Sequence, residues 1–550
     1  MLPSKKDNIN ESVRVLSPEQ EANSDQDSDP TTPLGVLSTV DSLESVDSLQ
    51  HTEETPIGRH IGSFGVVMMI VQRIIGSGIF AVSGSIYQNV GGSPFLFFFV
   101  WACAGYMSFA GVFCFLELGS LVPRSGGMKV FLQYIYYRCR MMVTVVFGLY
   151  SIMFGFTISN AIIFGEYTLY ALGFDNVEKE TAKHVGLLFV VSMCVLNGIS
   201  PHWGVKAQNV VGAIKLGLLF LMAFSGIWVL LFPSSMTHVE NQLHWSDFFV
   251  VKREITVGSL GSALLKAIFS FDGWQTAQIV TNEIKDPVRT MNFAAPLALA
   301  LINVCYFCIN LSYLAVIPDK DLSKLQEMVG NILMERIFGP IIGRRLLTLI
   351  VAISAAGNIM TVLYHISRMN QDVFREGFLP FSHFFASNKP FGSPMRCLVF
   401  PLVISAVFLL VPTPSNVYNW VVNLEGYPSQ LFVGLTCFGI ILLRRRNQGK
   451  QPEFKARLIH IIFVTAFDAF VCISALNPRS MSKEYAGFPN YAYVALSILF
   501  GSFLYWLVLF KILPRLGHYK LEKYTIELSD GLTMKKWAKI RNAGMASADV

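Results

Sequence analysis

The sequence predicts an all-α polytopic membrane protein with about twelve transmembrane helices, two of them broken near the middle. Of its 550 residues, 53% are hydrophobic and only 15% are charged. Apolar segments of about 20 residues recur along the chain, and this length matches the hydrocarbon core of a bilayer. Two interruptions, Gly76-Ser77-Gly78 and Phe269–Gly273, place glycine and polar residues where an anchoring helix would have neither.

Residues 1–57 precede the first apolar segment and are expected to form a disordered cytoplasmic tail. They are rich in Ser, Asp and Glu and nearly free of aromatic residues, so they cannot bury enough apolar surface to fold. No signal-peptide pattern is present. The tail is equally consistent with passive solubilising sequence and with a regulatory segment. In the second case its serines are phosphorylated, and Lys5 and Lys6 accept ubiquitin from a ligase that an adaptor brings to the tail.

Residues 58–513 are predicted to form the membrane domain, and residues 514–550 a cytoplasmic C-terminal tail. The expected helices are 61–88, 94–122, 141–172, 184–200, 204–232, 256–283, 291–317, 344–374, 396–412, 416–443, 458–476 and 491–513. Polar residues interrupt several of them. Simple anchors are therefore not expected, because polar groups at membrane depth must face protein or a water-filled cavity.

Lysine and arginine concentrate in the loops that follow even-numbered segments, as in Arg444-Arg445-Arg446 after the tenth. Since such residues favour the cytoplasmic side, both termini are expected in the cytoplasm. The net charge of +6 follows from this topology and does not indicate a nucleic-acid partner. The chain has no HExxH, GxSxG or phosphate-binding glycine loop and no metal-spaced histidines. Neither an enzyme nor a metal or other cofactor is therefore expected.

The interruptions at Gly76–Gly78 and Phe269–Gly273 occupy corresponding places in the first and sixth segments. Each glycine costs a helix about 1 kcal/mol relative to alanine, so its presence needs a reason. Broken helices at matching places in two halves of a chain are typical of a transporter binding site. Close helix packing through small residues is the alternative for Gly76 and Gly78.

Six segments carry a resemblance to a known family: Ile75–Phe80, Glu117–Gly119, Pro123–Gly127, Glu283–Thr290, Arg375–Ser382 and Leu513–Leu521. The first four are similar to the amino acid–polyamine–organocation superfamily and, within it, to the L-type amino acid transporter branch. The last two resemble the fungal methionine permeases of that branch. The resemblance covers about residues 58–521. It implies ten core helices in two inverted five-helix repeats plus two further helices, with helices 1 and 6 unwound around the substrate.

The resemblance also implies which residues bind the substrate. The substrate carboxylate is expected at Ile75, Gly76, Ser77 and Gly78. The ammonium group and the side chain are expected at Phe269, Ser270, Phe271, Asp272 and Gly273, with Trp274 as an aromatic gate. The chemistry of a helix break agrees, because unpaired N–H groups attract a carboxylate and unpaired carbonyls attract an ammonium. An α-amino acid carries one of each.

Lys215 lies well inside the fifth segment, where a lysine costs about 2.5 to 3.5 kcal/mol on insertion scales. It matches the lysine that occupies the place of a sodium ion in sodium-independent members of the superfamily. We therefore expect sodium-independent transport in which Lys215 takes part in ion coupling. A fixed structural cation is an equal alternative, and a side chain extended to the cytoplasmic interface is less favoured by its depth.

Asp272 departs from the family, which usually has a small residue before the Gly273-Trp274 pair. A carboxylate at this depth needs a cation, a hydrogen-bond donor or a proton. The candidate partners are the α-ammonium of the substrate, a cationic substrate side chain and a coupled proton, which makes Asp272 a second ion-coupling candidate. The alternative is an aspartate held structurally by backbone N–H groups at the break.

The predicted function is proton-coupled uptake of methionine, a neutral amino acid, by alternating access at the plasma membrane. The alternatives are a permease for cationic or a broad range of neutral amino acids, and a nutrient sensor derived from a permease. The animal L-type carriers are linked to a heavy subunit through a cysteine after the third segment. Here the loop Gly173–Lys183 has no cysteine, so no disulfide-linked heavy chain is expected.

Overall fold

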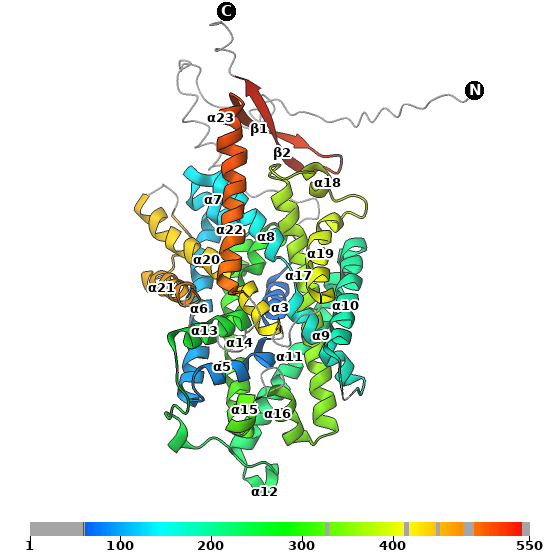
Figure 1. Cartoon of the computed structure of the whole chain (residues 1–550), viewed down its shortest axis with the longest axis vertical. Coiled ribbons are helices and arrows are strands. Elements are labelled where there is room, and N and C mark those ends of the chain that lie inside the picture. Colours follow the sequence, from blue (N-terminus) through cyan, green and yellow to red (C-terminus); the bar gives the residue numbers. More distant parts are fainter. Residues whose placement is uncertain are drawn as a thin grey trace, which may run out of the picture.

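The computed structural model describes residue 59 and residues 61–76, 78–174, 176–324, 329–411, 417–446, 451–476 and 489–541. These residues form a long bundle of helices with a pair of strands at one end (Figure 1). The predictions on the tail 1–57, including Lys5 and Lys6, and on Ser77 lie outside the described residues.

The helices follow the order of the predicted segments. The first six segments hold α3 (Ser63–Ile74), α4 (Gly78–Ala81), α5 (Ser83–Asn89), α6 (Pro94–Leu121), α7 (Met128–Ile135), η2 (Tyr137–Cys139), α8 (Arg140–Phe154), α9 (Ile158–Ala171), α10 (Lys179–Ile199), α11 (Pro201–Leu231), α12 (Ser234–Thr237), η3 (Trp245–Asp247), α13 (Val257–Phe271) and η4 (Trp274–Glu283), counting the loops between them.

The second half of the chain ends in two strands. It holds α14 (Pro287–Val316), α15 (Asp319–Lys324), α16 (Val329–Phe338), α17 (Ile342–Phe374), α18 (Ser382–Ala386), η5 (Met395–Leu398), α19 (Val399–Leu410), α20 (Val417–Arg446), α21 (Leu458–Ser474), α22 (Tyr491–Leu507), η8 (Val508–Ile512), α23 (Leu513–Leu516), β1 (Tyr519–Glu527) and β2 (Thr533–Arg541). The η elements are 3-10 helices, except η8, which is a π-helix.

The prediction of an all-α polytopic membrane protein is confirmed. Within the described residues, nine helical stretches are long and apolar enough to cross a membrane, and Met395–Leu410 and Leu458–Ser474 are shorter apolar helices. The sixth predicted segment is not among them because α13 ends after 15 residues. Each predicted segment thus coincides with one helix or with consecutive helices.

Local sequence explains where several helices begin. Proline opens α6, α11 and α14, where its missing N–H costs nothing because the first turn has no intrahelical acceptor for it. Helix α13 begins at a capping box, in which the Thr256 side chain accepts from the Ser259 backbone and the Ser259 side chain accepts from the Thr256 backbone. The helix α3 packs against α11, α14, α17 and η4, which places it inside the bundle.

The first and sixth segments are broken where the sequence predicts. Helix α3 ends at Ile74, Ile75 is extended, and helical structure resumes at Gly78. Helix α13 ends at Phe271, Asp272 is extended, and Gly273 has a φ of 117° before η4 begins. Only glycine adopts such a backbone angle without strain, so Gly273 sets the direction of the chain after the second break.

A third break separates α8 from α9 and was not predicted, because segment 141–172 was expected to be one continuous helix. Helix α8 ends at Phe154 and α9 begins at Ile158. A Cβ atom on Gly155 would lie 2.3 Å from the Ser151 carbonyl oxygen and 2.5 Å from Cγ1 of Ile366. Glycine at this position therefore allows the end of α8 to approach α17.

The C-terminal segment forms an antiparallel hairpin that was also not predicted. Strands β1 and β2 pair from Tyr519 with Arg541 to Glu527 with Thr533. The hairpin packs on the end of α17, where Lys535 N–H donates to the Arg375 carbonyl (2.8 Å). Arg375 Nε donates in turn to the Thr533 carbonyl (2.7 Å). This contact places the hairpin over one end of the helical bundle (Figure 1).

Candidate functional site

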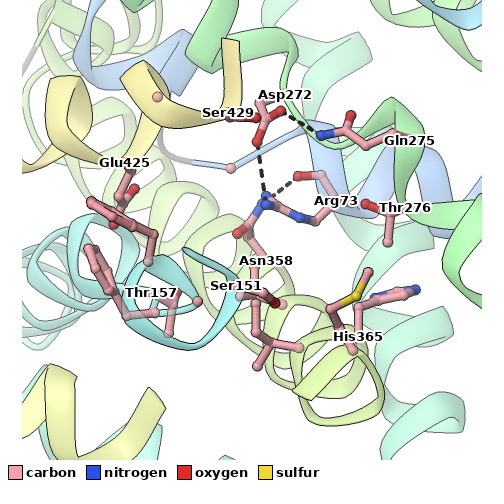
Figure 2. A pocket seen from close by; sticks show the side chains of 18 of the residues that line it. Arg73, Ser151, Thr157, Asp272, Gln275, Thr276, Asn358, His365, Glu425 and Ser429 are labelled. Carbon is pink, nitrogen blue, oxygen red and sulfur yellow. Dashed lines mark hydrogen bonds and ion pairs between the residues drawn. The ribbon is translucent and has the colours of Figure 1, made fainter. Parts of the chain in front are cut away.

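A cavity of about 160 Å³ lies where the three chain breaks come together. Four of the predicted site residues line it, namely Gly76, Gly78, Phe269 and Asp272. Six further predicted site residues are described by the structure but do not belong to the cavity wall: Ile75, Lys215, Ser270, Phe271, Gly273 and Trp274. Figure 2 shows the polar side chains that reach into the cavity from α3, α8, α17, α20 and the second break.

An ion pair between Arg73 and Asp272 crosses from the first break to the second. Arg73 Nη2 lies 3.5 Å from Asp272 Oδ2, and the side chains remain 25% and 23% exposed, respectively. Gln275 Nε2 donates to the other oxygen of Asp272 (2.9 Å), as Figure 2 shows. Asp272 is therefore not a lone carboxylate. The partner was missed, although a basic residue three positions before Gly76 in an apolar segment is itself a signal.

Two asparagines hold the end of α3 in place. Asn358 Nδ2 donates to the Arg73 carbonyl (2.6 Å), and Asn160 Nδ2 donates to Asn358 Oδ1 (3.2 Å). Because the break removes the intrahelical donor for this carbonyl, a side chain takes its place. A Cβ atom on Gly76 would lie 3.0 Å from both asparagine side chains, so glycine permits this close contact.

Lys215 supports the same end of α3 from α11. Its ammonium donates to the carbonyls of Gln72 (3.2 Å) and Ser354 (3.1 Å), and the residue is 1% exposed. Ser354 Oγ donates to the Gly76 carbonyl (3.1 Å). These contacts offset the cost of burying the lysine, because its ammonium is hydrogen-bonded and because the Gln72 carbonyl lies in the last turn of α3, where carbonyls lack intrahelical donors. They agree with the fixed-cation alternative, and an ion-coupling role for Lys215 stays a prediction.

The rest of the second break packs tightly. A Cβ atom on Gly78 would lie 2.9 Å from the Ser270 Cα atom, and Tyr306 donates to the Ser270 carbonyl (3.0 Å). The Phe271 ring packs against Tyr306 and Trp101, with centroid distances of 5.0 and 6.0 Å. These contacts fix the two breaks against each other and against α6 and α14.

Trp274 lies outside the cavity wall. Its buried ring packs edge-on against Phe115 at 4.8 Å, and a Cβ atom on Gly111 would lie 2.7 Å from it. Its role as a gate stays a prediction. Gly273, beside it, packs on Arg73, since a Cβ atom there would lie 2.3 Å from Arg73 Cγ.

A second acidic residue, Glu425 of α20, lines the cavity near the third break. Ser159 Oγ donates to Glu425 Oε2 (2.8 Å), and the Ser159 backbone N–H lies 3.5 Å from Oε1. Ser159 is the second residue of α9. From the sequence, an acid inside the tenth segment was a candidate to touch the pocket, but no family motif placed Glu425 there, and its contact depends on a break that the sequence signals only through Gly155.

Four aromatic rings form an apolar part of the wall. They belong to Phe147, Tyr150, Phe154 and Phe156, at the end of α8 and in the third break. Met128, Ile279 and Met369 line the cavity on the side of the hairpin. The cavity wall is thus polar at the first two breaks and mainly aromatic beside α8, where Ser151 and Thr157 are its polar members.

Close to Met128 and Met369, ion pairs join α7 and strand β2 to the C-terminal end of α17. Lys129 lies 3.5 Å from Asp372 and 3.3 Å from Glu376, and Lys535 of β2 lies 2.8 Å from Glu376. Burial raises the pKa of Glu376, but the charges of Lys535 and Lys129 outweigh burial and hold it well below its usual range. Burial lowers the pKa of Lys535 to about 8, although Glu376 opposes that change.

Comparison with known proteins gives the family. Residues 61–503 match the amino acid permease family. The chain is 34% identical to the low-affinity methionine permease of Saccharomyces cerevisiae over 517 residues, 92% of this chain and 93% of that protein. It is 29% identical to the high-affinity methionine permease of the same yeast over 498 residues, 89% of this chain and 86% of that protein.

A human protein matches over a similar length. The chain is 25% identical to the b(0,+)-type amino acid transporter 1 of Homo sapiens over 464 residues, 83% of this chain and 89% of that protein. The resemblance to the superfamily, its L-type branch and the fungal methionine permeases is thereby confirmed. The chain belongs to the amino acid permease family, a family of membrane transporters and not of enzymes.

Proposed function

We propose that this permease imports methionine together with protons across the plasma membrane by alternating access, with both termini in the cytoplasm. The observation that carries the proposal is the cavity between broken α3 and broken α13, which presents Arg73 and Asp272 side by side. A zwitterionic amino acid has a negative and a positive group bonded to one carbon atom, and this wall offers a partner of opposite charge for each.

The substrate backbone is assigned to the two breaks. Its carboxylate is proposed to bind the segment Ile75–Gly78, where glycine lets the ligand approach the main chain. Its ammonium is proposed to bind the carbonyls and the Asp272 carboxylate of Phe269–Gly273. When the substrate binds, the Asp272 carboxylate gives up part of its contact with Arg73 and contacts the substrate ammonium instead. Such an exchange keeps every charged group paired while the substrate enters.

The aromatic wall beside α8 favours an apolar side chain. A thioether packs well against aromatic rings and methionine side chains, because its sulfur is polarizable. Phe147, Tyr150, Phe154 and Phe156 supply the rings. This surface supports methionine over a cationic amino acid, whose charged end would have to be desolvated against it.

Alternating access is proposed to use the two ends of the cavity. The contact of Gly78 with Ser270 seals one side, whereas Met128 and Met369 line the other side below the ion pairs of Lys129. With the termini in the cytoplasm, the hairpin end is the cytoplasmic end. Import then takes two steps. The Gly78–Ser270 contact opens to admit the substrate, and after it has closed the ion pairs of Lys129 open to release the substrate into the cytoplasm.

One observation favours a second candidate, a permease for cationic amino acids. The cavity wall of the described chain has two carboxylates, Asp272 and Glu425, and one guanidinium, Arg73. A lysine or arginine substrate would balance this excess. We retain methionine for two reasons. A bound proton balances the excess negative charge equally well, and the aromatic wall favours an uncharged side chain.

Two partner assignments accompany the proposal. No disulfide-linked heavy chain is proposed, since residues 173–183 contain no cysteine. A ubiquitin ligase adaptor is proposed to act on the N-terminal tail through Lys5 and Lys6. Non-reducing electrophoresis of the protein purified from its own membrane tests the first assignment, because a covalent partner would appear as a band that reductant removes.

The decisive test is uptake of labelled methionine into permease-deficient yeast that expresses this chain. We expect saturable uptake that a proton uncoupler abolishes and that sodium removal leaves unchanged. Competition by lysine or arginine stronger than competition by methionine would establish the cationic candidate instead. A protein that binds methionine in vesicles without moving it would be a sensor, and this outcome would overturn the proposal.

A further inference from the structure

Glu425 lies on the cavity wall and faces the first turn of helix α9. Its partly buried carboxylate accepts a hydrogen bond from Ser159 Oγ (2.8 Å) and lies beside the Ser159 N–H, in the first turn of α9. The first turn of a helix has N–H groups without intrahelical partners and carries partial positive charge, so it stabilises a nearby anion. The third break thus builds a place for an ionised carboxylate.

The charges around Glu425 do not balance. Among the described residues, the charged members of the cavity wall are Arg73, Asp272 and Glu425. Arg73 already lies 3.5 Å from Asp272. The cavity with both acids ionised therefore has one excess negative charge, and a zwitterionic substrate does not change this sum. An uncompensated charge in a closed, dehydrated cavity is costly.

We infer that Glu425 is the proton-binding group of transport, which is loaded while the cavity is open and neutralises it before the substrate is enclosed. This inference rests on the proposed function and deepens it. The proton comes from water in the open cavity, forms an O–H bond on the Glu425 carboxylate, and returns to water on the other side. The Arg73–Asp272 pair remains ionised throughout the cycle.

Other groups near the cavity are less suited to this role. Asp272 is held by Arg73 and Gln275. Lys215 is 1% exposed and lies outside the wall. His365 Nδ1 lies 2.7 Å from the Thr361 carbonyl, and a charged imidazolium would stand one turn from Arg368 on α17.

The other helices that pack against α20 carry Glu117 on α6, which pairs with Arg444, and Asp468 on α21, which packs against Gly434, but neither residue belongs to the cavity wall. Tyr150 of α8 shares the cavity with Glu425 but is neutral in its ordinary form. Helices α6, α7, α21 and α22 also pack against α20. In the described part of the chain, only α7 of these four contributes to the wall, through the uncharged Met128.

The test uses the purified full chain in liposomes with an imposed gradient of about two pH units. Coupling of one proton to one methionine then permits roughly a hundredfold accumulation, since each pH unit is a tenfold proton gradient. Glu425→Gln keeps a side chain that accepts from Ser159 and mimics the protonated acid. We expect this variant to exchange labelled methionine for unlabelled methionine but to reach an accumulation ratio of about one. It should also lose methionine-induced proton uptake, read with a pH-sensitive dye.

Two further variants make the test specific. Glu166→Gln, a matched change on α9 outside the cavity wall, should keep the wild-type accumulation ratio. Ser159→Ala removes the hydroxyl that stabilises the ionised carboxylate, so the pH at which uptake is half-maximal should rise by roughly one unit. This variant keeps Glu425 and tests the inference even where Glu425→Gln fails to fold.

The outcomes separate the inference from the proposed function. Proton-driven accumulation by Glu425→Gln at the wild-type ratio overturns the role of Glu425 and leaves methionine transport standing, as does an unshifted pH profile in Ser159→Ala. A wild-type protein that exchanges no methionine overturns the proposed function and this inference with it. Loss of coupling in both Glu425→Gln and Glu166→Gln counts against Glu425 as the specific site.

Discussion

The Arg73 guanidinium lies 3.5 Å from the Asp272 carboxylate, so an ion pair joins the two broken helices directly across the cavity. The two residues are far apart in sequence: Arg73 lies in the last turn of α3, next to the first break, and Asp272 lies within the second break. Any substrate that binds between the breaks must meet this pair. We therefore expect the pair to couple substrate entry to the relative position of α3 and α13.

Asp272→Asn should raise the KM for methionine about tenfold, because Arg73 then faces the cavity without its partner and the substrate ammonium loses a carboxylate. The double variant Arg73→Gln with Asp272→Asn should recover part of that loss, since it removes the unpaired charge. Uptake kinetics of the two single variants and the double variant form a double-mutant cycle. Strictly additive effects would contradict direct coupling of these residues.

Lys215→Ala should lower the thermal stability of the detergent-purified protein by roughly 1 to 3 kcal/mol, because the carbonyls of Gln72 and Ser354 lose a buried donor. Lys215→Gln retains N–H donors and should retain more of that stability. Thermal unfolding followed by intrinsic fluorescence measures both. If Lys215→Gln keeps proton-driven accumulation, the lysine is a fixed cation. Loss of accumulation in a stable Lys215→Gln protein would instead support the coupling role predicted from the sequence.

The sequence predicts the broken helices because their signals are local. Glycine and polar residues inside an apolar segment stand out at Gly76–Gly78 and Phe269–Gly273. The third break depends on Gly155 alone, and one glycine in an apolar segment is a weak signal. The hairpin had a clearer signal in the sequence. Asp530-Gly531 is a typical turn pair, and apolar and polar residues alternate in the segments on either side of it.

The partners inside the site could not be predicted in the same way. Asn160 and Asn358 are 198 residues apart, and Ser159 and Glu425 are 266 residues apart. Periodicity assigns each residue to a helix but not to a neighbour on another helix. For Arg73 and Asp272, the cost of a charge at membrane depth required some partner for each, and only the packing of α3 against the second break identifies the pair.

Gly78→Ala should abolish most methionine uptake, because the new methyl group would lie 2.9 Å from the Ser270 Cα atom and a backbone atom cannot move aside cheaply. Gly217→Ala on α11 is a matched control, since no atom lies within 4 Å of a Cβ there. That control should leave uptake intact and, if anything, stabilise its helix by up to about 1 kcal/mol. Surface expression must be measured for both variants. Wild-type uptake by Gly78→Ala would show that the close contact is dispensable.

The docking of the C-terminal hairpin should depend on pH through Glu376. Lys535 and Lys129 hold the pKa of this carboxyl well below its usual range against the effect of burial, so the docked state binds a proton more weakly than the undocked state. The contribution of Glu376 to docking is thus fully present above about pH 4.5, the ordinary pKa of glutamate, and is lost as pH falls below that value. The protection factors of the β1 and β2 amides, which are exchange rates corrected for the intrinsic effect of pH, should fall in that acidic range.

Lys535 makes docking of the hairpin depend on pH in a second, more alkaline range, where docking again becomes stronger as pH rises. Burial lowers its pKa to about 8 from an ordinary 10.5, so the undocked lysine again binds the proton more tightly. Docking should therefore strengthen as pH rises from about 8 to 10.5. Glu376→Gln should weaken docking at neutral pH and flatten the acidic limb, while Lys535→Met should flatten the basic limb. Constant protection factors across both ranges in the wild type would show that this ion pair does not control the hairpin.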